Sequence, residues 1–225
     1  MIVTKKVHRG ASVIAAIVML LMALISVASS AISMITGSAS ASAVVFNLII
    51  PLIFNTLTII ALFRGKKDTV AAVFFLIMAA YTLFRNVFGN IGSIISNLFL
   101  TAGSSTFDMM APYSIFSGLI YLVSNLALLA FYVLLALECL KPGMVSGGKL
   151  KAMLLVLPIC NIALSALAFT VMQLGYIQLG YSVVAIITSA VATVVFGIGT
   201  VLLGLAFSIP VYEKKQEIIQ QEITE

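Results

Sequence analysis

The chain has 225 residues, of which 62% are hydrophobic and 8% are charged, and its mean hydropathy is +1.23. Soluble domains carry about 25% charged residues, so this composition excludes a soluble fold. The net charge of +5 is not typical of a nucleic-acid-binding protein. Its basic residues form short clusters rather than a groove with interleaved aromatic residues.

Six long apolar stretches predict a membrane protein of the all-α class. Each exceeds the roughly 17 residues that a helix needs to cross the hydrocarbon layer, and lipid favours helices because it offers no partner to an exposed backbone amide. A β-barrel would show alternating strands of about ten residues, which the sequence lacks. We therefore expect one polytopic helix bundle over residues 1–210 and a short charged cytoplasmic tail over 211–225. The predicted spans are 11–36, 44–63, 69–88, 113–138, 151–172 and 181–208.

The lysines and arginines other than Arg85 fall in four short clusters that the apolar stretches separate. If consecutive spans cross in alternate directions, every cluster lies on one side, and basic loops are typical of the cytoplasmic side. We expect both termini in the cytoplasm and the lipid bilayer to be the plasma membrane of a bacterium. The clusters are Lys5/Lys6/Arg9, Arg64/Lys66/Lys67, Lys141/Lys149/Lys151 and Lys214/Lys215.

The first predicted span has an alternative interpretation as a cleaved signal peptide. It follows basic residues and precedes Ala-x-Ala motifs within 38–43. Its apolar run, from Ala11 to Ile35, is longer than the roughly 7–15 residues of a signal core. We expect this segment to be retained as a membrane helix.

A helix is also predicted on the outer side, within the long linker between the third and fourth spans. Ile91, Ile94, Ile95 and Leu98 recur there at helical spacing. This pattern indicates an outer helix at about 91–100 that lies at the interface or re-enters the bundle. It would act either as a cover of the outer rim or as a lid over a site.

Polar residues near the centres of the spans are the candidates for a binding site. Asn55, Asn125 and Asn161 fall at similar depth in the second, fourth and fifth spans. Such amides either line a cavity or only join helices, at about 0.6 kcal/mol per contact. Arg85 lies near the outer end of the third span. It either binds a carboxylate or phosphate through its planar fork, or extends to the surface with its head in water, or pairs instead with Asp108 of the outer loop. The candidate ligand-binding residues are Asn47, Asn55, Tyr81, Arg85, Tyr121, Asn125 and Asn161.

Small residues on the sixth span recur in steps of three and four. Such a stripe lets helix backbones approach closely, either within the chain or against a partner subunit. The candidate packing or partner residues are Ser189, Thr193, Gly197, Thr200 and Gly204.

Groups for catalysis and metal binding are scarce. His8, the only histidine, lies in the amino-terminal tail, and no acidic residue falls near the middle of a predicted span. We therefore expect no enzyme activity, no metal and no cofactor. The sequence has no phosphate-binding Gly-rich loop with a lysine, so transport driven by ATP would need a partner ATPase or other membrane subunits.

These patterns favour a membrane subunit that binds or transports a small anionic or polar solute in an outward-facing cavity at the bilayer midplane. Pro51 with Asn55 and Pro158 with Asn161 mark matching positions in the two halves, as broken helices do in transporters. In size and span count the chain is similar to the substrate-capture subunits of energy-coupling-factor transporters. In that family, small residues at four-residue spacing on the first span mediate docking.

Ala11 and Ala15 have this spacing, but a match of two residues does not assign the family. The alternative function is a non-transporting interaction protein, such as an assembly factor, an immunity protein or a scaffold. Such a protein would use the small-residue helix faces to hold its partner.

Overall fold

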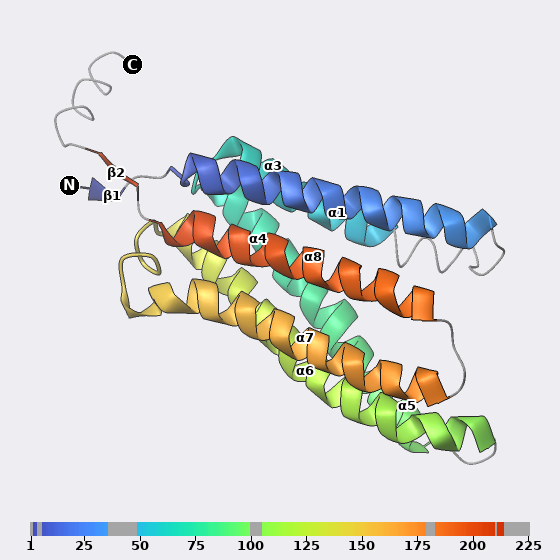
Figure 1. Cartoon of the computed structure of the whole chain (residues 1–225). Coiled ribbons are helices and arrows are strands. Elements are labelled where there is room, and N and C mark those ends of the chain that lie inside the picture. The colour runs from blue at the N-terminus through green and yellow to red at the C-terminus, as the bar shows by residue number, and fades with distance from the viewer. Residues whose placement is uncertain are drawn as a thin grey trace.

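The computed structural model describes residues 2–3, 6–35, 49–99, 105–178, 183–209 and 211–213. Over these residues the chain forms a bundle of long helices and one short antiparallel pair of strands (Figure 1). The elements are β1 (Ile2–Val3), α1 (Arg9–Ile35), α3 (Ile50–Arg64), α4 (Thr69–Tyr81), η2 (Thr82–Val87), α5 (Phe88–Phe99), α6 (Ser105–Leu140), η3 (Lys149–Ala152), α7 (Met153–Gln178), α8 (Val183–Ser208) and β2 (Tyr212–Glu213).

Three helical segments within the described residues are long and apolar enough to cross a membrane. They are Thr69–Phe99, Met110–Leu140 and Lys149–Gly175, and shorter apolar segments are found at Arg9–Ile25 and Val194–Ser208. Many large apolar side chains on these helices are exposed on the outside of the bundle, where lipid is as favourable a solvent as the protein interior. The chain is therefore an all-helical membrane protein.

The helices contact one another in a closed order around the bundle. α1 packs on α3, α3 on α4, α4 on α6, α6 on α7, α7 on α8, and α8 again on α1. The core between them is rich in alanine and aromatic side chains, and the Phe75 and Phe207 rings meet edge to face at 5.3 Å between centroids. Small and flat side chains let the helices approach closely, which is how helices associate in lipid.

The third helix is longer than predicted. The helix predicted at about 91–100 is present as α5, but it is not a separate helix, because α4, η2 and α5 are continuous from residue 69 to residue 99. The chain stays helical because η2 winds as a π-helix, in which the Phe88 amide bonds to the Leu83 carbonyl five residues back. α5 then rests on α6, where the Asn97 amide donates to the Ser114 hydroxyl at 2.7 Å.

Both ends of the described chain lie at the same end of the bundle. β1 pairs with β2, and Lys6 pairs with Lys66 through the backbone. The Val7 amide donates to the carbonyl oxygen of Gly65, which ends α3 with a φ of 60°, a conformation that glycine adopts without strain. The loop between α6 and α7 lies at this end too (Figure 1).

We call this part of the molecule the basic end, because it gathers the described members of three of the predicted clusters. These members are Lys6, Arg9, Arg64, Lys66, Lys67, Lys141, Lys149 and Lys151. Lys214 and Lys215 lie outside the described residues.

A buried ion pair joins several segments at the basic end. Lys67 precedes α4, Glu138 is in the last turn of α6, and each side chain is 0% exposed. The Lys67 Nζ donates to Glu138 Oε1 at 2.7 Å and to the carbonyl oxygen of Phe207 in α8 at 3.3 Å. The carboxylate also accepts backbone amides and a hydroxyl of the loop after α6, which are donated by Gly143, Val145 and Ser146. The pair thus ties the start of α4 to the ends of α6 and α8.

The small-residue stripe of α8 packs inside the chain where its side chains are described. A Cβ added to Gly197 would overlap Ile162 of α7, and one added to Gly204 would overlap the Leu154 carbonyl oxygen. Thr200 is 0% exposed, and its hydroxyl donates to the Gly197 carbonyl at 2.8 Å. The side chains of Ser189 and Thr193 lie outside the described ones. Ala11 and Ala15 of α1 are also buried, at 7% and 0% exposure.

Asp68 caps the amino terminus of α4 on the surface of the basic end. Its carboxylate accepts the Ala71 amide at 2.9 Å and pairs with the Arg64 guanidinium. The hydrogen bond from Ala71 has the largest effect on this carboxyl group. Together with Arg64 it outweighs the opposing desolvation and holds the pKa of Asp68 below its ordinary value.

Replacing Asp68 with alanine is expected to lower the free energy of unfolding by about 1 kcal/mol at neutral pH, because the cap is lost. The folded-state pKa is the lower one, so the stabilisation is complete above the ordinary Asp value of about 4 and fades as the pH falls through the folded value. Reversible unfolding in mixed micelles at pH 7 and pH 3 tests this. Asp68→Asn, which keeps a capping side chain, is the control, and an Ala effect of equal size at both pH values would contradict the expectation.

Candidate functional site

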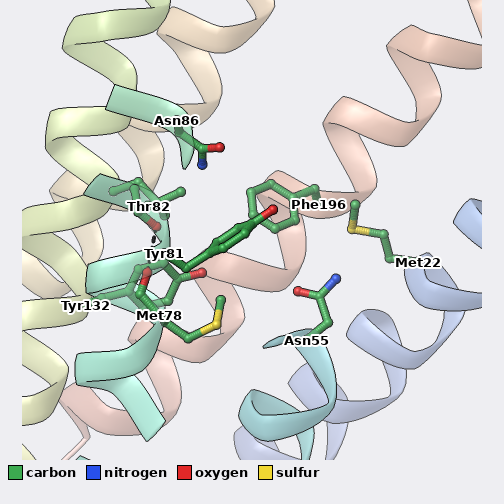
Figure 2. A pocket seen from close by; sticks show the side chains of 9 residues that line it. Met22, Asn55, Met78, Tyr81, Thr82, Asn86, Tyr132 and Phe196 are labelled. Carbon is green, nitrogen blue, oxygen red and sulfur yellow. Dashed lines mark hydrogen bonds between the residues drawn. The ribbon is translucent and has the colours of Figure 1, made fainter. Parts of the chain in front are cut away.

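A cavity of about 230 Å³ lies inside the bundle, at the junction of α4 and η2. We call it the central cavity (Figure 2). Apolar side chains from α1, α4, α6 and α8 form much of its wall, and polar groups come from α3, η2 and two tyrosines. The lining residues are Met22, Asn55, Met78, Tyr81, Thr82, Asn86, Leu128, Tyr132 and Phe196.

The Tyr81 side chain projects into this cavity. Figure 2 shows its side chain reaching across the space toward Phe196 of α8, with the Asn55 amide on one side of the ring and the Asn86 amide on the other. Tyr132 is 1% exposed and forms the wall behind. A ligand here would therefore meet aromatic faces and two amides that can each donate or accept hydrogen bonds.

A second, more polar cavity of about 470 Å³ adjoins the first. We call it the polar cavity. Its lining residues are Arg85, Asn86, Gly89 and Asn90 from η2 and α5, with Tyr121 and Asn125 from α6. Asn86 lines both cavities, and among the described residues that line either one Arg85 is the only charged residue. The polar cavity therefore offers one cation and a set of neutral hydrogen-bonding groups.

The π-helical winding of η2 explains how one helix contributes to both cavities. In an α-helix, residues five apart point in different directions, whereas an i to i+5 turn places them on one face. Tyr81 and Asn86, five residues apart, both line the central cavity. Arg85 is then directed to the polar cavity with Asn90, its neighbour five residues on. π-Helical turns of this kind are frequent at functional sites.

Several of the sequence-predicted residues meet at these cavities. Asn55 and Tyr81 line the central cavity, and Arg85, Tyr121 and Asn125 line the polar cavity. Asn47 lies outside the described residues.

Asn161 lies elsewhere, between α6 and α7. Its Nδ2 donates to the Ser124 carbonyl at 3.0 Å and to the Ser124 hydroxyl at 2.8 Å. The Ser124 hydroxyl also interacts with the Asn161 carbonyl oxygen and with the Ser165 hydroxyl. Asn161 is 3% exposed, and these bonds satisfy its amide nitrogen. In the structure Asn161 therefore joins α6 to α7. The sequence had suggested it as a ligand-binding residue because of its depth in the predicted span.

Sequence reasoning missed Asn86, which lines both cavities, and Asn90, which lines the polar cavity. In a regular α-helix, Tyr81 and Arg85 share a face and Asn86 points away from it. The sequence pattern therefore did not indicate Asn86 as a site residue. The high density of polar residues in Arg85–Asn90 was the available clue. The extra residue in the π-helical turn determines which way the Asn86 side chain points.

Within the part of the chain that the structure describes, no group of three or more His, Cys, Asp or Glu side chains is placed to hold a metal ion. The structure thus defines a helical membrane protein with a central cavity and an adjoining polar cavity that is open to the surface. No family model, curated protein or solved structure matches this chain.

Proposed function

We propose that the protein is a multi-pass subunit of a bacterial plasma membrane that binds or transports a small anionic or polar solute. The observation that carries this proposal is the pair of cavities that share Asn86, with Arg85 as a charged group in the wall of the polar cavity. Intramembrane ionisable and amide groups that face a cavity rather than lipid are typical of solute pathways. The proposal includes no catalytic step, no cofactor and no nucleic-acid partner.

The orientation follows from the basic end. Basic loops are retained in the cytoplasm, so the basic end would face inward and both termini would be cytoplasmic, with six crossings. The polar cavity is built from η2, α5 and the middle of α6, on the part of the bundle away from the basic end (Figure 1). In this orientation the polar cavity faces outward, where it receives solute from outside the cell.

Energy for transport would come from other membrane subunits or a partner ATPase, since the chain has no nucleotide-binding loop. The small-residue face of α8, which suggested a non-transporting interaction protein, is used within the chain at Gly197 and Gly204. This internal use favours the solute-binding proposal.

The test is thermal unfolding of the protein in lipid nanodiscs with a panel of small carboxylates, phosphates and neutral polar solutes. A solute present at about 100 times its Kd raises the free energy of unfolding by about 2.7 kcal/mol. At least one class in the panel is expected to stabilise the wild-type protein. Arg85→Ala and Asn125→Ala are each expected to remove most of that gain.

Lys149→Ala and Ser93→Ala are the matched controls. Both positions are exposed, and neither lines the central or the polar cavity, so both should keep the full gain in stability. The proposal fails if no solute in the panel stabilises the wild type, or if both cavity variants respond as the controls do.

A further inference from the structure

We infer that the solute is an amphipathic anion with an aromatic body of one or two rings, which fills the central cavity, and an acidic group held in the polar cavity beside Arg85. This inference rests on the proposed function and narrows its ligand class. It is carried by the different chemistry of two cavities that share Asn86 as a common wall.

The central cavity fits an apolar, flat group. Met22, Met78, Leu128 and Phe196 supply apolar wall, and methionine sulfur makes favourable contacts with ring edges. An apolar protein cavity of about 150 Å³ holds one benzene molecule. The central cavity, at about 230 Å³, therefore has room for a body slightly larger than a single ring.

Tyr81 favours a ring over a flexible chain. Its side chain crosses the cavity toward Phe196 (Figure 2), so an inserted group lies against aromatic faces. Ring pairs in offset or edge-to-face contact gain more than their buried area alone provides. An alkyl chain of equal volume lacks this gain and also loses rotamer freedom on binding.

The polar cavity fits the acidic group. Arg85 supplies the cation, and Asn86, Asn90 and Asn125 supply neutral amides. A guanidinium matches a carboxylate or phosphate through two parallel hydrogen bonds. The central cavity by itself is smaller than the range of about 300–1,000 Å³ that drug-sized ligands occupy, so a ligand of that size would extend past Asn86 into the polar cavity.

Equilibrium dialysis against the full chain in nanodiscs tests this inference, with empty nanodiscs correcting for partition into lipid. The probes are 2-naphthoate, its neutral amide 2-naphthamide, octanoate and acetate. 2-Naphthoate is expected to bind at least about tenfold more tightly than each other probe, a difference equal to the loss of one charge-assisted hydrogen bond or one buried ring contact. This comparison needs no variant, so it does not depend on whether a mutant folds.

Two variants assign the contacts. Arg85→Gln is expected to remove the preference for the acid over the amide, and Phe196→Leu to reduce the preference for 2-naphthoate over octanoate. Equal binding of acid and amide, or of octanoate and 2-naphthoate, overturns the inference, and the second result would indicate an acyl chain of lipid type. If 2-naphthoate does not bind but acetate or inorganic phosphate stabilises the protein through Arg85, the inference fails and the proposed function stands. If nothing in either panel binds, both fail.

Discussion

Replacing Glu138 with alanine is expected to destabilise the protein by about 3–5 kcal/mol, the usual cost of breaking a buried ion pair by removing one partner. The Glu138 carboxylate is the common acceptor for Lys67 and for the loop that follows α6. Without it, the Lys67 side chain, which is 0% exposed, loses its counter-ion, and several backbone amides lose their acceptor.

Lys67→Met is expected to cost less than Glu138→Ala. The carboxylate would still accept the donors from Gly143, Val145 and Ser146, and the methionine would fill most of the volume of the lysine stem. The double variant Lys67→Met/Glu138→Met is expected to be more stable than Glu138→Ala, because no unpaired charge remains inside the protein.

The exposed pair of Arg64 and Asp68 is the matched control for the buried one. Arg64→Ala is expected to change the free energy of unfolding by less than about 1 kcal/mol, as exposed ion pairs do. Reversible unfolding in mixed micelles of a mild detergent and dodecyl sulfate measures all four variants. An effect of Glu138→Ala no larger than that of Arg64→Ala would show that the buried pair does not hold the basic end together.

Gly204→Ala is expected to lower the free energy of unfolding by about 3 kcal/mol or more. Overpacked cores typically lose roughly 1–3 kcal/mol, so this is the upper end of that range. The added methyl group would overlap the Leu154 carbonyl oxygen of α7, which is backbone and cannot rotate aside. Pro158, four residues after Leu154 in α7, has no amide hydrogen to donate to that carbonyl. The proline thus leaves an oxygen that the glycine backbone of α8 can approach closely, and a side chain at position 204 pushes the two helices apart.

Gly92→Ala is the matched control for Gly204→Ala. Gly92 lies within helix α5, and an added Cβ would meet nothing within 4 Å. Alanine there should be neutral or stabilising by about 0.5–1 kcal/mol through its higher helix propensity. The same unfolding assay compares the pair, and equal stability of the two variants would contradict the close approach of α7 and α8.

Hydropathy was sufficient to predict the helices but not their ends. The predicted span 69–88 became part of a helix that runs to Phe99, and the span 113–138 became α6, which begins at Ser105. Composition shows where a segment becomes polar. A helix, however, continues for as long as its backbone hydrogen bonds form and a neighbouring helix packs against it. The packing of α5 on α6 provides that support here.

The site was predictable at the level of residue type and depth, but not of direction. Asn55 and Asn125 line cavities while Asn161 joins two helices, and depth along a helix does not specify which neighbour an amide meets. The burial of Lys67 could not be predicted either, because its sequence neighbours mark an ordinary surface cluster and its partner Glu138 lies far along the chain.

The closed order of the described helices means that none of them is an outermost member at which disassembly would begin. α1 and α8, the first and last of the described helices, pack against each other, and β1 pairs with β2 just beyond them. Force applied through tags on the two termini would therefore act first on the β1–β2 pair and next on the contact between α1 and α8. Joining the termini through a short linker would hold α1 and α8 together. The contact between these two helices is therefore the one that a covalent link between the termini reinforces most directly.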